Sequence, residues 1–121
     1  NQKKDMPTII CGDLNSIISG DETEHELKQF ASKIGLQDCF EMLNYDNFDR
    51  GTYVYYNKVG IINLMQLDYA LLHPKWRHII GPGTQVLGFD GDKKTTLPTS
   101  RKERSNLPSD HYPIFLEINL G

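Results

Sequence analysis

The sequence has no long hydrophobic run, few cysteines and no surplus of basic charge. No apolar stretch approaches the roughly 20 residues of a membrane-spanning helix, and no signal-peptide pattern opens the chain. The two cysteines, Cys11 and Cys39, match neither a disulfide framework nor a CxxC metal motif. We therefore expect buried thiols in a reducing compartment, cytoplasmic or nuclear. The net charge of −3 lacks the basic surplus typical of proteins that track nucleic-acid phosphates.

The chain also lacks internal repeats and low-complexity segments. Its 121 residues suit one domain at most, with a hydrophobic content that is ordinary for a globular chain. We expect one unit over residues 1–121, with a loose lead-in at 1–6 and a mobile basic loop at 90–106. That loop carries five basic residues: Lys93, Lys94, Arg101, Lys102 and Arg104. It is either solvated or in contact with phosphate groups.

A carboxylate and an imidazole stand side by side near the end of the sequence, at Asp110 and His111. Pro113 disfavours a helix and biases the residues before it toward extended geometry. The apolar run at 114–118 has the composition of a strand. Neighbouring side chains of an extended chain point in opposite directions, so the two groups can meet different partners. A solvated turn that happens to contain both residues is the plain alternative.

A second polar pair follows the strand predicted at residues 7–11. Gly12 permits a turn there, and strand alternation puts Asp13 and Asn15 on one side with Leu14 facing away. A carboxylate and an amide at the end of a buried strand suit a metal ion or a phosphate. An ordinary Asx-rich turn is the alternative.

Periodicity and composition predict the remaining elements. A helix is expected from residue 21 or 23 to residue 34, ended by Gly35, with a further helical turn within 36–43. Strands are expected at 52–56, 66–73 and 86–89. The loop at 44–51 lacks the ligand spacing of an EF-hand.

Two of these strands carry residues that need an explanation. Asp68 stands in an apolar run, where an acid is costly unless a partner satisfies it. That partner is either the backbone or a histidine that the acid orients. The strand at 52–56 has three tyrosines, Tyr53 among them, which either stack on a base or sugar or simply pack against one face.

Three motifs, taken in order, resemble the C-terminal half of the endonuclease/exonuclease/phosphatase superfamily, which includes deoxyribonuclease I-like enzymes. They are Gly12-Asp13-Leu14-Asn15, Gln66-Leu67-Asp68-Tyr69 and Ser109-Asp110-His111-Tyr112-Pro113. The resemblance spans residues 8–119. It implies an α/β fold, the C-terminal half of a four-layer sandwich, in which one mostly antiparallel or mixed sheet has a helix packed on one face.

The resemblance implies a role for each polar residue of the motifs. His111 would be the general base of a metal-dependent phosphodiester hydrolase, and Asp68 would orient it. Asn15 would bind the phosphate or the nucleophile, and Asp13 would position the nucleophile or help to protonate the leaving oxygen. Asp110 would lie near Mg²⁺ or Mn²⁺. The expected substrate-binding residues are Asn15, Tyr53, Arg101, Lys102 and Arg104.

The family's principal metal-binding Glu belongs to a first half that has no counterpart in this sequence. We therefore expect a fragment or one partner of an assembly, inactive without an N-terminal half. A bare sheet face would favour self-association. Nucleic acid is the leading substrate, because Asp68-Tyr69 differs from the Asp-Arg pair of inositol-polyphosphate phosphatases. The alternatives are a lipid head group, a small phosphoester, or a non-catalytic binding or scaffold module.

Overall fold

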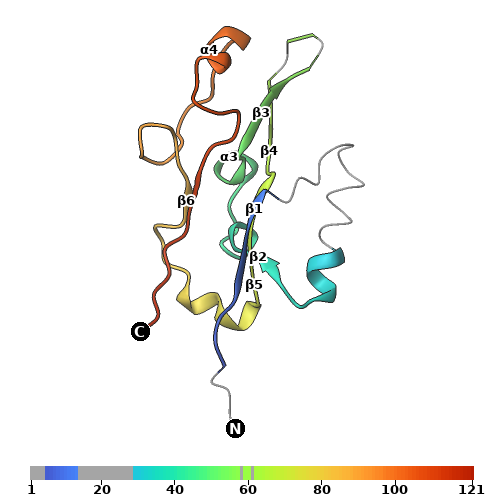
Figure 1. Ribbon diagram of the computed structural model, residues 1–121, viewed down its shortest axis with the longest axis vertical. Coiled ribbons are helices and arrows are strands. Elements are labelled where there is room, and N and C mark those ends of the chain that lie inside the picture. Colours follow the sequence, from blue (N-terminus) through green and yellow to red (C-terminus); the bar gives the residue numbers. More distant parts are fainter. Residues whose placement is uncertain (1–4, 14–28, 58, 61) are drawn as a thin grey trace.

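The computed structural model describes residues 5–13, 29–57, 59–60 and 62–121. Within them the chain is a mixed α/β structure of small antiparallel sheets and short helices (Figure 1). One sheet has the order β1 (Ile9–Asp13), β5 (Asp68–Leu72), β2 (Gln37–Asp38); the others pair β3 (Tyr53–Tyr56) with β4 (Ile62–Met65) and β6 (Gln85–Val86) with β7 (Ile114–Phe115). The helices are α2 (Cys39–Met42), α3 (Asn47–Arg50), α4 (Arg101–Ser105) and the 3-10 helix η1 (Pro74–Ile79).

The expected α/β class is confirmed at this level, but the expectation of one sheet is wrong for the described residues. The strands form separate small sheets that meet at single bridges, such as Tyr53 with His111. Next to that bridge, the amide of Tyr112 donates to the carbonyl of Thr52 at 2.7 Å. The amide of Thr52 donates to the carbonyl of Met65 at 2.9 Å rather than back to Tyr112, so the pairing does not extend into a longer ladder.

Strand β5 organises the sheet that leads to the candidate site. It lies between β1 and β2 and is covered on both faces. Ala70 and Leu72 pack into a core cluster with Cys39 and Ile79, while Tyr69 and Leu71 pack into another with Ala31. A strand buried on both faces reads as a continuous apolar run, which is why the sequence predicted it.

Several element boundaries differ from the sequence predictions. Strand β1 does not stop before Gly12 but continues to Asp13, which pairs with Asp68 of β5. Strand β4 was not predicted, because Asn57, Gly60 and Asn63 give this segment the composition of a turn. The start of the predicted helix at 21–34 lies outside the described residues, and residues 29–33 are helical.

The predicted end of that helix at Gly35 is confirmed. Gly35 has φ +77°, its amide donates to the carbonyl of Ser32 at 3.1 Å, and the amide of Leu36 donates to that of Ala31 at 2.8 Å. These paired bonds form a Schellman motif, which needs a left-handed residue where glycine carries no steric penalty.

The expectation of two buried thiols is half right. Cys39 is buried, but Cys11 is exposed, because it lies on β1 at the edge of its sheet. Other apolar side chains are also open to solvent, among them Met6, Ile10, Phe115 and Leu120. Self-association through these residues stays a prediction. In the part of the chain that the structure covers, no helix has the length and apolar character to span a membrane.

The segment at 90–106 contains α4 and a lysine in an unusual setting. Lys94 is only 2% exposed, so it is neither solvated nor in a position to contact a phosphate group, the two alternatives for this loop. Its ammonium group donates to the carbonyls of Phe48 and Gly51 and lies over the ring of Phe48. Burial lowers the pKa of Lys94 from its usual value of 10.5 to about 8, although the nearby carboxylate of Asp49 opposes this shift.

The free energy of unfolding should therefore rise with pH between pH 8 and 9. In this range the folded protein has begun to release the Lys94 proton while the unfolded chain still holds it. The expected gain is about 1 kcal/mol. The buried Cys39 thiol, whose pKa is raised from 9.0 to about 12, works in the opposite direction as pH approaches and passes 9, so the contribution of Lys94 is the difference in slope between the wild-type protein and Lys94→Met. Urea unfolding at pH 8.0, 8.5 and 9.0 measures the slope, and Lys94→Met should flatten it. An equal slope in both proteins would contradict this origin.

Candidate active site

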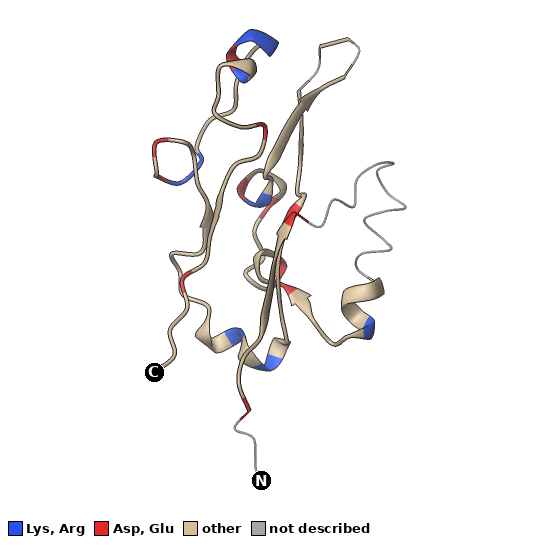
Figure 2. Cartoon of the chain, viewed as in Figure 1, with Lys and Arg blue, Asp and Glu red and all other residues tan. Residues whose placement is uncertain are grey.

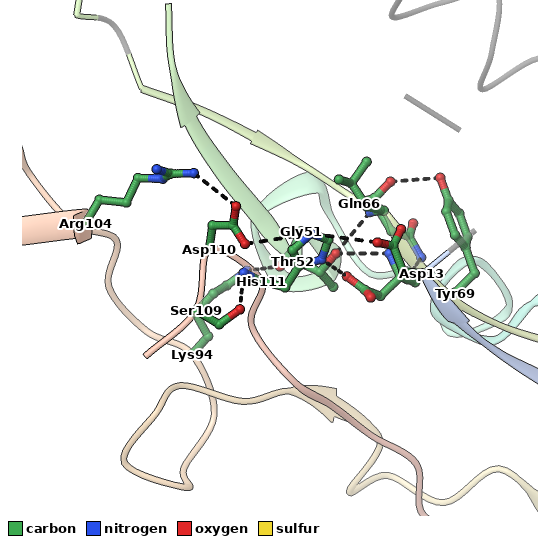
Figure 3. A network of polar contacts seen from close by, with 12 residues as sticks. Asp13, Gly51, Thr52, Gln66, Tyr69, Lys94, Arg104, Ser109, Asp110 and His111 are labelled. Atoms are coloured by element: carbon green, nitrogen blue, oxygen red, sulfur yellow. Dashed lines mark hydrogen bonds and ion pairs between the residues drawn. The ribbon is translucent and has the colours of Figure 1, made fainter. Parts of the chain in front are cut away.

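Three chain segments meet at one end of the sheet β1-β5-β2 (Figure 3). The register of β1 and β5 sets Asp13 opposite Asp68, so two carboxylates lie side by side at the strand ends. The bridge between Tyr53 and His111 brings an imidazole to the same place. A register slip of one residue would turn either carboxylate to the other face, so the apolar pattern of β5 also fixes the site.

Asp68 and His111 form a close pair. The distance from His111 Nδ1 to Asp68 Oδ2 is 2.8 Å, within the range of a charge-assisted hydrogen bond. An ionised carboxylate only accepts hydrogen bonds, so Nδ1 carries the proton. This bond answers the question raised by an acid in an apolar strand: the partner of Asp68 is a histidine.

The other ring nitrogen faces two further carboxylates. His111 Nε2 lies 3.9 Å from Asp13 Oδ2 and 4.0 Å from Asp110 Oδ1. Both distances are too long for a direct hydrogen bond. Neither carboxylate therefore forms a hydrogen bond with Nε2. In the neutral imidazole with its proton on Nδ1, Nε2 carries a lone pair that can accept a proton.

The carboxylates also set the proton affinity of the imidazole. Burial lowers the pKa of His111, but the hydrogen bond to Asp68 and the negative charges around the ring outweigh it, so the pKa lies above its ordinary value of 6.5. The charges are those of Asp68, Asp13 and Asp110. The site therefore stabilises the imidazolium form that a base passes through.

Two predicted substrate residues line the rim. The ring of Tyr53 lies 5.2 Å from that of His111, centroid to centroid, and the Arg104 guanidinium carbon lies 5.8 Å from the Tyr53 centroid. Arg104 Nε donates to the carbonyl of Val54 at 2.7 Å, and an Arg104 terminal nitrogen lies 3.5 Å from Asp110 Oδ2. The guanidinium is thus held beside Tyr53 and Asp110, the two residues that lie near the imidazole.

The other predicted residues are placed differently. Arg101 and Lys102 are exposed on α4, where Arg101 donates to the carbonyl of Asn57 at 2.9 Å rather than to a residue of the site. Figure 2 shows the basic residues scattered over α4, η1, α3, the loop before α4 and the helix before β2 rather than in a continuous band. Asn15 lies outside the described residues.

The donor set can accommodate a divalent cation. Asp13, Asp68 and His111 each offer one ligand atom, and these atoms lie within 4.8 Å of one another. Carboxylate oxygens suit Mg²⁺ and Mn²⁺, and an imidazole nitrogen suits Mn²⁺ better than Mg²⁺. Asp110, which the family resemblance places near the metal, is not part of this group and pairs with Arg104 instead.

Sequence reasoning missed the residues that support the pair. Thr52 Oγ1 accepts from the amides of Leu67 and Asp68, and Ser109 Oγ accepts from the amide of His111 at 3.0 Å. A threonine at a strand start and a serine in a turn are too common to mark a site. The position of Ser109 within the Ser-Asp-His motif is the one signal that the sequence offered.

Comparisons with protein-family models, with curated proteins and with solved structures find no match to this chain. The function therefore has to be argued from the geometry of the site and from the motifs themselves.

Proposed function

We propose that this chain carries the general base of a metal-dependent phosphodiester hydrolase that acts on nucleic acid. The observation that supports this best is the 2.8 Å bond between His111 Nδ1 and Asp68 Oδ2, with Nε2 left to accept a proton. A base oriented by a carboxylate through its far nitrogen is a recurring arrangement in hydrolases. Asp13, in register with Asp68, adds the second carboxylate that a phosphodiester site needs for a metal or a leaving oxygen.

In the proposed reaction His111 Nε2 takes a proton from the attacking water. Asp68 keeps the ring in the tautomer with Nδ1 protonated and stabilises the imidazolium that forms. Asp13 lies 3.9 Å from Nε2 and is placed to orient the water or to protonate the leaving oxygen. A divalent cation, held by Asp13 and Asp68, would supply positive charge for the extra negative charge of the pentacovalent phosphorus.

The rim favours nucleic acid over other phosphodiesters. Tyr53 presents an aromatic ring for stacking on a base or sugar, and Arg104 presents a guanidinium that suits a phosphate. The net charge of −3 argues against a long phosphate-tracking surface. We therefore propose that Tyr53 and Arg104, rather than a broad basic surface, recognise the nucleic acid.

The finer fold assignment belongs to the same proposal. On the motifs, we assign the small sheets to the C-terminal half of a four-layer α/β sandwich. We also propose that the principal metal-binding Glu comes from a segment outside residues 1–121. The alternative is a non-catalytic module of the same fold that binds a cation or phosphate but cleaves nothing.

Cleavage assays test the assignment on a longer protein, one that contains residues 1–121 together with the segment proposed to supply the metal-binding Glu. We expect Mg²⁺- or Mn²⁺-dependent nicking of supercoiled plasmid, and much slower hydrolysis of bis-p-nitrophenyl phosphate and of sphingomyelin vesicles. Faster hydrolysis of the sphingomyelin vesicles than of the plasmid would indicate that the substrate is a lipid head group. If none of the three substrates is hydrolysed with either metal, the enzyme assignment fails and the non-catalytic module is the remaining proposal.

Metal binding gives a separate prediction. If Asp13 and Asp68 hold the cation and His111 acts as the base, Asp13→Asn should weaken Mn²⁺ binding by at least about tenfold. His111→Ala should leave the affinity nearly unchanged. Asp92→Asn, an exposed acid in another loop, is the matched control. Titration calorimetry or the Mn²⁺ EPR signal gives the affinities, and a large loss in His111→Ala would make His111 a ligand instead of a base.

A further inference from the structure

Thr52 is a buried threonine whose side chain bonds to the backbone under Asp68. It has 0% exposure, and it lies just before β3. Its Oγ1 accepts hydrogen bonds from the amide of Leu67 at 3.0 Å and from the amide of Asp68 at 3.1 Å. One hydroxyl oxygen thus satisfies two donors where the chain enters β5.

The backbone of the same residue holds the segment that carries the imidazole. The carbonyl of Thr52 accepts from the amide of Tyr112, the neighbour of His111, at 2.7 Å, and its own amide donates to the carbonyl of Met65 at 2.9 Å. Figure 3 shows Thr52 lying between the strand end that carries Asp13 and the loop that carries His111. The two halves of the Asp68–His111 pair are therefore tied to one residue.

We propose that Thr52 is a positioning residue that sets the distance between Asp68 and His111, an inference that rests on the proposed function for its catalytic consequence. The two side chains come from segments far apart in the sequence, so their 2.8 Å contact depends on how those segments are placed. A hydrogen bond weakens steeply when its length or angle departs from the optimum. A displacement of about 1 Å can cost about 100-fold in rate.

Three variants separate this role from general packing. Thr52→Val keeps the shape but removes the acceptor, leaving the amides of Leu67 and Asp68 without it. Thr52→Ser keeps the oxygen and should rescue. Thr84→Val is the matched control, because Thr84 is equally buried and its Oγ1 accepts from the amide of Glu117 at 3.1 Å, on the β6–β7 side of the molecule.

Two readouts are measured on each folded variant. The first is the NMR resonance of the His111 Nδ1 proton, which the bond to Asp68 shifts downfield and which His111→Ala identifies by its loss. The second is steady-state plasmid nicking by the longer protein that also contains the segment proposed to supply the metal-binding Glu. In Thr52→Val we expect the resonance to move upfield or vanish and kcat to fall about 10- to 100-fold with little change in KM. Thr52→Ser and Thr84→Val should resemble the wild-type protein in both readouts.

An unchanged Nδ1 resonance in Thr52→Val would overturn the proposal. If Thr52→Val does not fold, Thr52→Cys, whose sulfur is a weak acceptor, takes its place. If the wild-type protein cleaves no phosphodiester, the proposed function fails, yet the resonance still decides whether Thr52 positions the pair.

Discussion

Under the proposed function, replacement of His111 by alanine is expected to slow phosphodiester cleavage by about 10²- to 10⁴-fold, the usual contribution of a general base. The base has to accept a proton at Nε2, and no other imidazole among the described residues is bonded to Asp68. The carboxylates of Asp13 and Asp110 lie close to Nε2, but a carboxylate is a much weaker base than an imidazole.

Two further variants test whether the loss of rate is specific to the Asp68–His111 pair. His78→Ala removes an exposed histidine of η1, away from the site, and should retain the wild-type rate. Asp68→Asn keeps the size of the side chain but not its charge, so it should lose a comparable share of the rate with little change in substrate affinity. Equal nicking by His111→Ala and the wild-type protein would remove His111 from the mechanism.

Replacement of Asp38 by alanine is expected to lower the free energy of unfolding by about 3–5 kcal/mol, the usual cost of leaving buried partners unpaired. Asp38 is 6% exposed. Its carboxylate accepts from the amide of Glu41 at 3.2 Å, from Gln66 Nε2 at 3.0 Å and from the amide of Ala70 at 3.3 Å. It also lies 3.5 Å from a terminal nitrogen of Arg50. Alanine would remove this acceptor from the amides of Glu41 and Ala70 and one partner from Gln66 and Arg50, which keep their contacts with the carbonyl of Asp68 and with Glu41.

Asp46→Ala is the matched control for this effect. Asp46 caps α3 as Asp38 caps α2, with its Oδ1 accepting from the amide of Asp49 at 2.7 Å, but that bond is exposed. Loss of an exposed cap costs about 1 kcal/mol. Urea unfolding of both variants at pH 7 makes the comparison. Equal losses would mean that Asp38 acts only as a cap and that its contacts with Gln66, Ala70 and Arg50 contribute little.

The parts of the site that could be predicted from sequence were those where one residue breaks a local rule. Asp68 is an acid in an apolar strand, which demands a partner; the local pattern left the backbone and a histidine open, and the family resemblance pointed to His111. Burial of both faces of β5 produced an apolar run that was easy to recognise. In these cases the chemistry of a few neighbouring residues carries the information.

The remaining features depend on contacts between distant segments, which local patterns do not encode. Lys94 looks like part of a solvated basic loop until the carbonyls of Phe48 and Gly51 are brought to its ammonium group. Arg101 and Arg104 share α4, yet one bonds to Asn57 and the other reaches the rim of the site. Their different roles follow from the placement of α4 beside the β3–β4 strands, which charge counting does not reveal.

The tautomer of His111 tests the central claim most directly. Long-range ¹H–¹⁵N NMR of the protein, recorded at a pH where the imidazole is neutral, distinguishes a protonated Nδ1 from a protonated Nε2. We predict that Nδ1 carries the proton, that it is shifted downfield by Asp68, and that Nε2 has the nitrogen shift of an unprotonated imidazole. A protonated Nε2, or an Nδ1 proton that does not respond to Asp68→Asn, would contradict the assignment of His111 as a base oriented by Asp68.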